Sequence, residues 1–393
     1  MTRRFVNPLQ FLALLAALGP IPAAAADPPG GARLLAKLPG PAGTAAAFSR
    51  DGKLLLTAGG DEARVWDAGT FEPVTPPLGH VKLKPLSDAS ISPDGKTVAT
   101  AAGGEVDLWS ARTGERLATI SHAASGRLQP VFSPDGTKLL TIVSLPEWTK
   151  EPPDAARDDQ LAKVWDVQTG KLLFELEHPW FVGYGCFGPN GNRVATFAAS
   201  KEDSWVGSAT LWDAGTGRNI RAVGAVDGSR PVSFSADGRR LAVAGWYRAD
   251  LLDGSDGKTL LTIHDFEHQE VPTCVSLSPD GSKLVTILQW WSVRCWDTKT
   301  GKPVGPRIPA RMGLSDAIFS NDGRLLLTPV TSGSTSVWDV RSGQRALTID
   351  SVAAPLTGHA PAAAFSPDGK RLAVGFTADG FTGIWELPDH KQP

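Results

Sequence analysis

Apolar and polar positions alternate along most of this chain in short runs separated by turn residues. The stretch 48–70, FSRDGKLLLTAGGDEARVWDAGT, contains the end of one apolar run, an Asp-Gly turn, a second run, a short loop and a third run that ends at Trp66 and Asp67. The runs are four to seven residues long and rich in Val, Leu, Thr and Trp. Such runs predict β-strands, and no stretch has sustained helical periodicity, so the pattern predicts an all-β chain.

The same order of runs and turns occurs eight times. The copies begin at Phe48, Ile91, Phe132, Phe187, Phe234, Leu277, Phe319 and Phe365. The third strand of each copy is predicted to end at Trp66, Trp109, Trp165, Trp212, Leu252, Trp296, Trp338 and Trp385. A Gly-containing turn and a fourth apolar run usually follow. In turns such as Ser-Pro-Asp-Gly, Pro presets φ, Asp bonds its own backbone and Gly adopts the left-handed conformation, so each copy is predicted to fold into consecutive hairpins.

Four strands per copy and a spacing of about 40 to 55 residues resemble the WD40 repeat of β-propellers. The family's Trp-Asp pair recurs, with the aspartates at Asp67, Asp166, Asp213, Asp297 and Asp339. The resemblance covers nearly all of residues 27–393 and implies a single propeller. The family's Gly-His signature occurs only at Gly79-His80 and Gly358-His359, and three copies depart from Trp-Asp, namely Leu252-Asp253, Trp109-Ser110 and Trp385-Glu386. These departures do not support the family's buried His-Ser-Asp-Trp hydrogen-bond chain in most copies.

The two ends of the repeat region indicate how the ring closes. The eighth copy stops after its third strand, whereas the apolar run at 33–38, RLLAKL, precedes the first copy as an unmatched fourth strand. Pairing these two strands completes one blade and removes two open sheet edges. We therefore expect eight four-stranded blades, with seven blades and an appended unit as the alternative.

Residues 1–26 have the features of a secretory signal. Arg3 and Arg4 precede the apolar run FLALLAAL, and small residues at 24–26 precede Asp27. The run is shorter than the ~20 residues that cross a bilayer. Cleavage after Ala26 predicts that 27–393 is a soluble propeller in the periplasm or outside the cell, without membrane insertion.

Net charge, cysteine positions and the absence of known motifs limit the kinds of partner and site that the sequence predicts. The formal net charge is -2, which gives no sign of the basic surface that nucleic-acid binding needs. Cys274 and Cys295 are predicted on the first and third strands of one copy, too far apart for a disulfide, and with Cys186 they are interpreted as small buried apolar residues. No metal spacing, nucleotide-binding motif or hydrolase motif occurs, so no metal, cofactor or catalytic residue is predicted.

Length variation is concentrated in connections that a WD40-like topology places on one face, notably at 145–160 and 200–208. Tryptophans outside the repeat positions fall in or beside the same connections of copies three to six. Large amphipathic aromatic side chains anchor binding surfaces, and acidic neighbours favour basic partners. The predicted partner-binding residues are Trp148, Trp180, Phe181, Tyr184, Trp205, Trp246, Tyr247, Trp290, Trp291, Glu147, Asp203 and Glu267. The alternative is that these rings only cover the loops.

The resemblance implies a non-catalytic scaffold that binds a protein or peptide. Glycan binding is an alternative, because Trp faces stack on sugar rings. An enzyme, such as a quinone-dependent dehydrogenase or a hydrolase, is a third interpretation. The turns at 166–171 and 297–302 are similar to those of quinone-dependent dehydrogenase propellers. Those propellers carry a vicinal disulfide, and no adjacent cysteines occur here.

Overall fold

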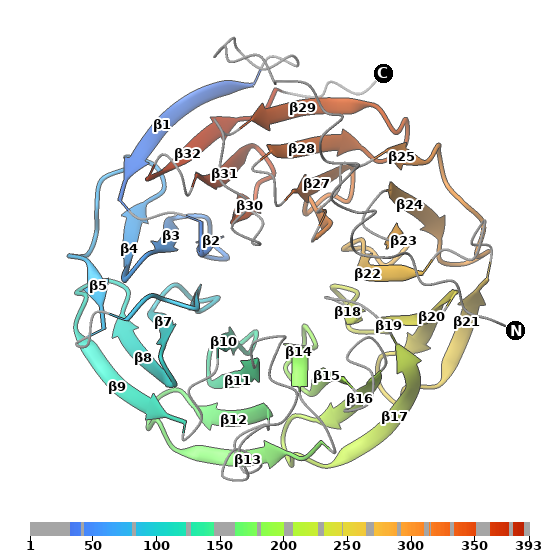
Figure 1. Cartoon of the computed structure of the whole chain (residues 1–393), viewed down its shortest axis with the longest axis horizontal. Coiled ribbons are helices and arrows are strands. Elements are labelled where there is room, and N and C mark those ends of the chain that lie inside the picture. Colours follow the sequence, from blue (N-terminus) through green and yellow to red (C-terminus); the bar gives the residue numbers. More distant parts are fainter. Residues whose placement is uncertain are drawn as a thin grey trace, which may run out of the picture.

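The computed structural model of the chain describes residues 32–40, 43–80, 84–122, 127–144, 162–178, 182–199, 207–226, 232–245, 247–264, 271–288, 292–309, 314, 316–330, 334–350, 362–376 and 380–388. In these residues, eight four-stranded antiparallel sheets form a ring around a central channel (Figure 1). The predicted all-β, eight-bladed propeller is confirmed, and the seven-bladed alternative is wrong. No helix in the described part of the chain is long and apolar enough to cross a membrane.

Each blade begins with its innermost strand, and later strands follow outward (Figure 1). Blades one to four consist of β2 (Ala45–Phe48), β3 (Leu54–Gly59), β4 (Glu62–Asp67) and β5 (Leu78–Gly79); β6 (Asp88–Ile91), β7 (Thr97–Ala102), β8 (Glu105–Ser110) and β9 (Arg116–Ser121); β10 (Arg127–Phe132), β11 (Lys138–Ser144), β12 (Ala162–Asp166) and β13 (Leu172–Leu176); and β14 (Val182–Phe187), β15 (Arg193–Ala199), β16 (Gly207–Asp213) and β17 (Asn219–Val226).

The second half of the ring repeats this order. Blades five to seven consist of β18 (Val232–Phe234), β19 (Arg240–Gly245), β20 (Arg248–Asp253) and β21 (Thr259–Ile263); β22 (Pro272–Leu277), β23 (Lys283–Leu288), β24 (Ser292–Asp297) and β25 (Ile308–Pro309); and β26 (Ile318–Phe319), β27 (Leu325–Pro329), β28 (Ser334–Asp339) and β29 (Arg345–Asp350). Blade eight combines β30 (Ala363–Phe365), β31 (Arg371–Phe376) and β32 (Phe381–Glu386) with β1 (Arg33–Pro39).

The first and last strands of the chain close the ring, as predicted. Strand β1 pairs antiparallel with β32 from Arg33 opposite Glu386 to Pro39 opposite Phe381. Figure 1 shows β1 beside β32 at the outer edge of blade eight. Leu38 of β1 is buried in a cluster with Leu55 and Trp66 of blade one. Closure therefore contributes both sheet hydrogen bonds and apolar packing.

The hydrophobic core is divided among the blade interfaces. Eight clusters of buried side chains each join two neighbouring blades, and together they follow the whole ring. The repeat tryptophans lie in these clusters; Trp296, for example, is 1% exposed and packs with Ala244 and Leu251 of blade five. Burial of one large side chain contributes roughly 1.5–3 kcal/mol, so these tryptophans stabilise seven of the eight interfaces, and Leu252 takes the equivalent position between blades four and five.

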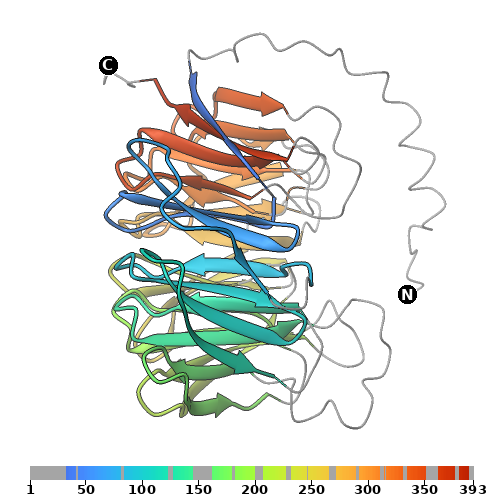
Figure 2. The same ribbon diagram turned by 90° about the vertical axis from the view of Figure 1, so that its left-hand side faces the viewer.

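Antiparallel strands give the disc two distinct faces. The turns that join strands one to two and three to four lie on one face, which we call the turn face (Figure 2). The connections between strands two and three, and between one blade and the next, lie on the opposite face, which we call the loop face. This arrangement agrees with the topology expected from the sequence.

Candidate functional site

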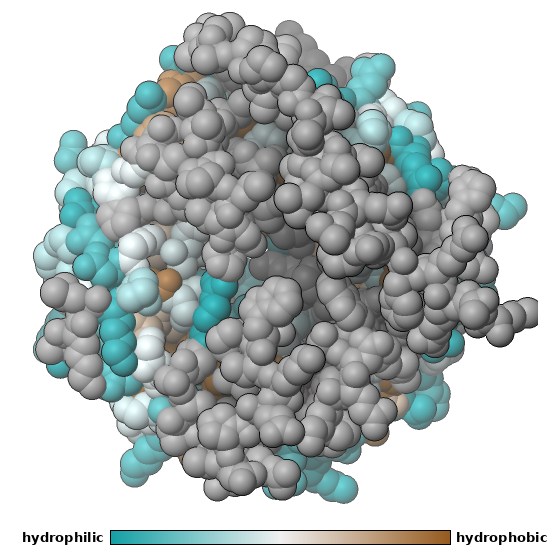
Figure 3. Space-filling model, viewed as in Figure 1, coloured by the Kyte–Doolittle hydropathy of each residue, from teal (hydrophilic) through white to brown (hydrophobic). Residues whose placement is uncertain are grey.

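Most of the predicted partner-binding residues belong to loop-face connections. Those that lie outside the described residues are Glu147, Trp148, Trp180, Phe181, Asp203, Trp205, Trp246, Glu267, Trp290 and Trp291. The view in Figure 3 shows the described residues toward the rim as mainly hydrophilic, with small hydrophobic areas between them. Tyr184 and Tyr247 are the two predicted residues that the structure describes.

Tyr247 lies at the tip of a tight hairpin on the loop face. The hairpin joins β19 to β20, and Gly245 pairs with Arg248 immediately below the tip. The Tyr247 backbone has φ of 52°, in the left-handed region that a bulky residue rarely adopts, and the residue is 42% exposed. A two-residue hairpin turn commonly requires a positive φ, so the tight turn accounts for this conformation.

A buried carboxylate holds the base of this hairpin. Asp250 is 6% exposed, and its Oδ2 lies 3.0 Å from Nε of Arg248. The hydroxyl of Thr262 donates to Asp250 Oδ1 at 2.7 Å. These contacts join the second hairpin strand to the outer strand β21, so Tyr247 is presented from a fixed base.

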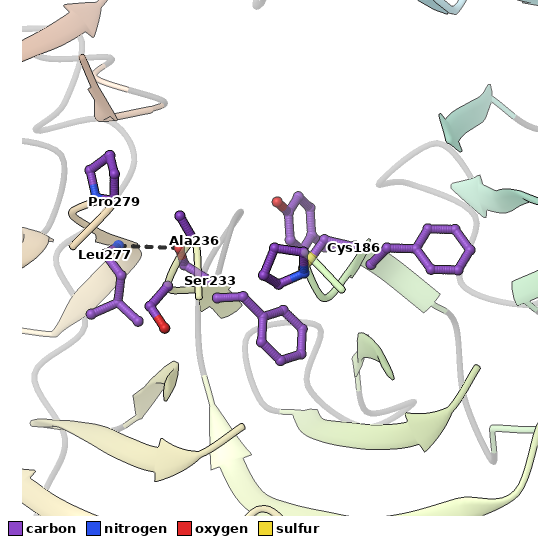
Figure 4. A pocket seen from close by; sticks show the side chains of 10 residues that line it. Cys186, Ser233, Ala236, Leu277 and Pro279 are labelled. Carbon is purple, nitrogen blue, oxygen red and sulfur yellow. Dashed lines mark hydrogen bonds between the residues drawn. The ribbon is translucent and has the colours of Figure 1, made fainter. Parts of the chain in front are cut away.

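Tyr184 lies on the innermost strand of blade four, where it lines a hollow in the channel wall. The hollow has a volume of about 320 Å³ and extends from β14 across β18 to β22. Figure 4 shows Cys186 on one side of it, with Ser233, Ala236 and Pro279 on the other. Sequence reasoning grouped Tyr184 with the loop residues and missed this hollow. Neither neighbouring glycine, Gly183 or Gly185, lines the hollow, and the sequence carried no clear signal for it.

The interpretation of all three cysteines as buried apolar residues is partly wrong. Cys274 and Cys295 are 1% and 3% exposed, whereas Cys186 is only partly buried and borders the hollow. Burial raises the pKa of the Cys295 thiol to about 11. The three cysteines all lie in described strands and form no disulfide, as predicted.

A buried hydrogen bond recurs between the second and third strands. In six blades the Trp indole donates to a Thr hydroxyl two residues beyond its cross-strand partner, at 2.7–3.0 Å. Blade two extends this contact into the family's full chain: His80 Nε2 lies 3.0 Å from Thr100 Oγ1, and His80 Nδ1 lies 3.3 Å from Asp107 Oδ2. A polar network of this kind fixes the packing of the blade.

Blade four has a shorter version of the same network. His178 Nε2 lies 2.8 Å from the hydroxyl of Thr196, which accepts the Trp212 indole hydrogen bond. The His178 ring also contacts Trp212 edge-on, with ring centroids 5.0 Å apart. Thr210 stands where blade two has Asp107, so no carboxylate at that position balances an imidazolium. Desolvation lowers the pKa of His178 to about 4.

The turn face is built from repeated Ser-x-Asp turns. In seven of them the Ser hydroxyl donates to the Asp carboxylate at 2.5–2.7 Å. The same Ser oxygen accepts an N–H from the start of the next strand, as Ser278 does from Lys283 at 2.9 Å. The hydrogen bond from Ser278 lowers the pKa of Asp280 to about 2. These carboxylates are therefore occupied in holding turns.

Within the described ranges, no group of three His, Cys, Asp or Glu side chains is placed to hold a metal ion. The candidate sites in the described residues are the loop-face hairpin with Tyr247 and the channel-wall hollow.

Comparison with known proteins supports the repeat assignment. The model for "WD domain, G-beta repeat" matches residues 33–67 and 351–386. The first match runs from β1 through β4, so the sequence repeat begins with the outer strand of one blade and continues into the next blade. This offset is the one that allows the two chain ends to share blade eight.

Two curated relatives are similar over about half of this chain. WD repeat-containing protein 1 of Xenopus tropicalis is 27% identical over 203 residues, which cover 47% of this chain and 31% of that protein. Autophagy-related protein 16 of Arabidopsis thaliana is 25% identical over 246 residues, 58% of this chain and 44% of that protein. The chain thus spans less than half the length of these relatives.

Among solved structures, the computationally designed Ika8 protein has a TM-score of 0.68. It is 20% identical in sequence, and the match covers 90% of this chain and 100% of that chain. This likeness concerns the fold alone. Taken together, the two family-model matches and the eight four-stranded blades show that the chain contains WD40 repeats and folds as an eight-bladed β-propeller.

Proposed function

We propose that this chain is a non-catalytic, exported scaffold that binds a protein or peptide through its loop face. The observation that carries the proposal is the concentration of length variation in connections on that face, while the turn face repeats the same hydrogen-bonded turns. Because loops tolerate insertions at little cost in stability, the constant scaffold leaves the loop face to vary with the partner. WD40 relatives are generally non-enzymatic interaction scaffolds, which agrees with this role.

The chemistry of the loop-face residues favours a partner with basic and apolar groups. Trp148, Trp180, Trp205 and Trp290 supply large apolar rings, and Glu147, Asp203 and Glu267 supply negative charge. Exposed charge pairs weaken as salt screens them, so the interaction should be weaker at high ionic strength. Tyr247, exposed at its hairpin tip, is the described residue that supports this surface.

A pull-down from the extracytoplasmic fraction of the source cells tests the binding face. The wild type is compared with a variant in which Trp148, Trp180, Trp205 and Trp290 are Ala. The matched control replaces four exposed rim leucines with Ala: Leu117, Leu172, Leu173 and Leu260. We expect to find partners that bind the wild type and the rim variant but not the Trp variant. With a purified partner, the wild type and the rim variant should bind with similar affinity and the Trp variant more weakly. Equal affinity of all three folded proteins would reject the loop face.

Export rests on the signal-like residues 1–26 and is tested separately. Expression of the full sequence in a bacterium followed by fractionation should give a periplasmic or secreted protein whose N-terminal residue is Asp27. A cytoplasmic protein that keeps residues 1–26 would contradict export and leave the binding-face experiment unaffected.

A further inference from the structure

The channel wall is irregular where the hollow lies. In the first-to-second strand pairings, blade four has a register shift between Val182 and Tyr184, and blade six has one between Pro272 and Cys274. Blade five, whose pairing is regular, lies between them. A bulge bends its strand and redirects the adjacent side chain, and bulges are common beside binding sites. These two bulges flank the wall segment that carries the hollow.

The turns at the rim of the hollow also depart from the repeat. Ala236 is exposed and stands where five other copies have Pro, so its small side chain leaves the rim open. The Ala236 N–H donates to the Pro279 carbonyl at 3.2 Å, which ties the turn of blade five to that of blade six. The copies with Pro at this position have no N–H to make this contact, so the substitution that opens the rim also adds an inter-blade hydrogen bond.

The lining of the hollow is aromatic and uncharged. Tyr184, Phe187 and Phe234 contribute rings, Pro189 and Pro279 contribute apolar edges, and no Asp, Glu, Lys, Arg or His lines it. Ser233 Oγ accepts the Leu277 N–H at 3.2 Å and keeps its hydroxyl proton to donate. Small-molecule sites combine such apolar walls with a few polar groups, and 320 Å³ lies at the small end of their size range.

We propose that this hollow binds a single uncharged aromatic ring that carries a hydroxyl or similar polar substituent. The ring packs against Tyr184, Phe234 and Pro279, and its substituent accepts the Ser233 hydroxyl proton. A charged ring is disfavoured because it would lose hydration without gaining an ionic partner among the lining residues. The site is independent of the loop face, so it can be tested whether or not the proposed function holds.

Cys186 gives a direct measurement of occupancy. The thiol borders the hollow, while Cys274 and Cys295 are 1% and 3% exposed. Iodoacetamide should therefore label the native protein at Cys186, and the two buried cysteines report on unfolding by mass spectrometry. p-Cresol, the neutral probe, should slow the labelling of Cys186 about threefold at twice its Kd. 4-Methylbenzoate and benzylamine, the charged probes, should slow it less at the same concentration.

Two matched variants test the location. Ala236→Phe should fill the rim, slow labelling without ligand and remove the effect of p-cresol. Asn321→Phe places the same side chain in the equivalent turn of blade seven, away from the hollow, and should behave as the wild type. Both must first show native melting. Undiminished labelling of the wild type at millimolar p-cresol, or unchanged protection in Ala236→Phe, would overturn the proposal.

The natural ring can come from a small molecule or from a polypeptide, and a second pair of probes separates these sources. A neutral capped tripeptide with a central Tyr is compared with p-cresol in the same labelling experiment. Stronger protection by the tripeptide supports a peptide side chain as the occupant, and stronger protection by p-cresol supports a free small molecule. Absence of protection by either probe counts against the site.

Discussion

Val374 of blade eight occupies the position at which six other blades have a Thr whose hydroxyl accepts a hydrogen bond from the Trp indole. The indole of Trp385 therefore lacks this acceptor. Leu372 pairs with Trp385, and Val374 is two residues farther along β31. The Trp385 Nε1 atom is buried and has no hydrogen-bond partner in the described residues. Blade five avoids this mismatch because both positions are apolar, with Val243 and Leu252.

The first prediction follows from this mismatch. Val374→Thr should stabilise the protein by about 1 kcal/mol, because a nearly isosteric hydroxyl would accept from Trp385 and donate to the Gly383 carbonyl. The converse change, Thr57→Val, should destabilise by about 1–3 kcal/mol, since it removes the acceptor that lies 2.9 Å from the Trp66 indole. Thermal or urea unfolding measures both. Changes of the same sign in the two variants would contradict the argument.

A second prediction concerns the ring-closing strand. Deletion of residues 27–40 should lower the melting temperature by at least about 5 °C, because it exposes the edge of β32 and removes Leu38 from its cluster. The control is Glu386→Gln, which breaks the exposed 2.9 Å ion pair with Arg33 and should change stability by less than about 0.5 kcal/mol. A deletion protein that melts like the wild type would rule out closure as a source of stability.

His178 should make stability depend on mildly acidic pH. Unfolded histidine binds a proton near pH 6.5, whereas folded His178 does so only near pH 4. The free energy of unfolding therefore falls as the pH falls from 6.5 to 4, by about 3 kcal/mol at most. His178→Gln keeps a polar group near Thr196 and should remove this part of the decline. Urea unfolding at pH 7 and 4.5 checks it, and parallel declines in both proteins would show that His178 is not the cause.

The Ser-x-Asp turns should make the stability of the protein depend on pH in a more acidic range than His178 does. Ser278→Ala should cost about 1–2 kcal/mol at pH 7, because it removes the hydrogen bond to Asp280 and the acceptor for the Lys283 N–H. The depressed pKa of Asp280 contributes stability above about pH 4, and this contribution is lost as the pH falls to about 2. The cost of the substitution should therefore be smaller at pH 2 than at pH 7. An equal cost at both values would argue against the Ser-to-Asp bond.

The blades were predictable from sequence because their turns are determined locally. Asp, Gly and Ser specify the hairpins at positions such as 278–281, and Trp marks the third strand of seven copies. Closure was predictable for a similar reason: the run at 33–38 had no other sheet to join. Register shifts were not predictable, since the bulge at Tyr184 depends on packing against neighbouring blades. The channel-wall hollow lies beside that bulge and was missed.

Buried hydrogen-bond partners were only partly predictable. His80 follows a Gly, as in the family's signature, but His178 follows Glu177 and reaches the corresponding Thr196 without that signature. The loop-face site itself stays a prediction. Tyr184 lies in the channel wall, and the other predicted residues except Tyr247 lie outside the described part of the chain.

Pairing of β1 with β32 also determines the order in which the protein can be completed. Arg33 and Glu386 are 353 positions apart, so β1 has no partner strand until β32 has been synthesised. The other seven blades are continuous in sequence and can form earlier, whereas blade eight is necessarily finished last. Synthesis of β32 is therefore the step that allows the ring to close.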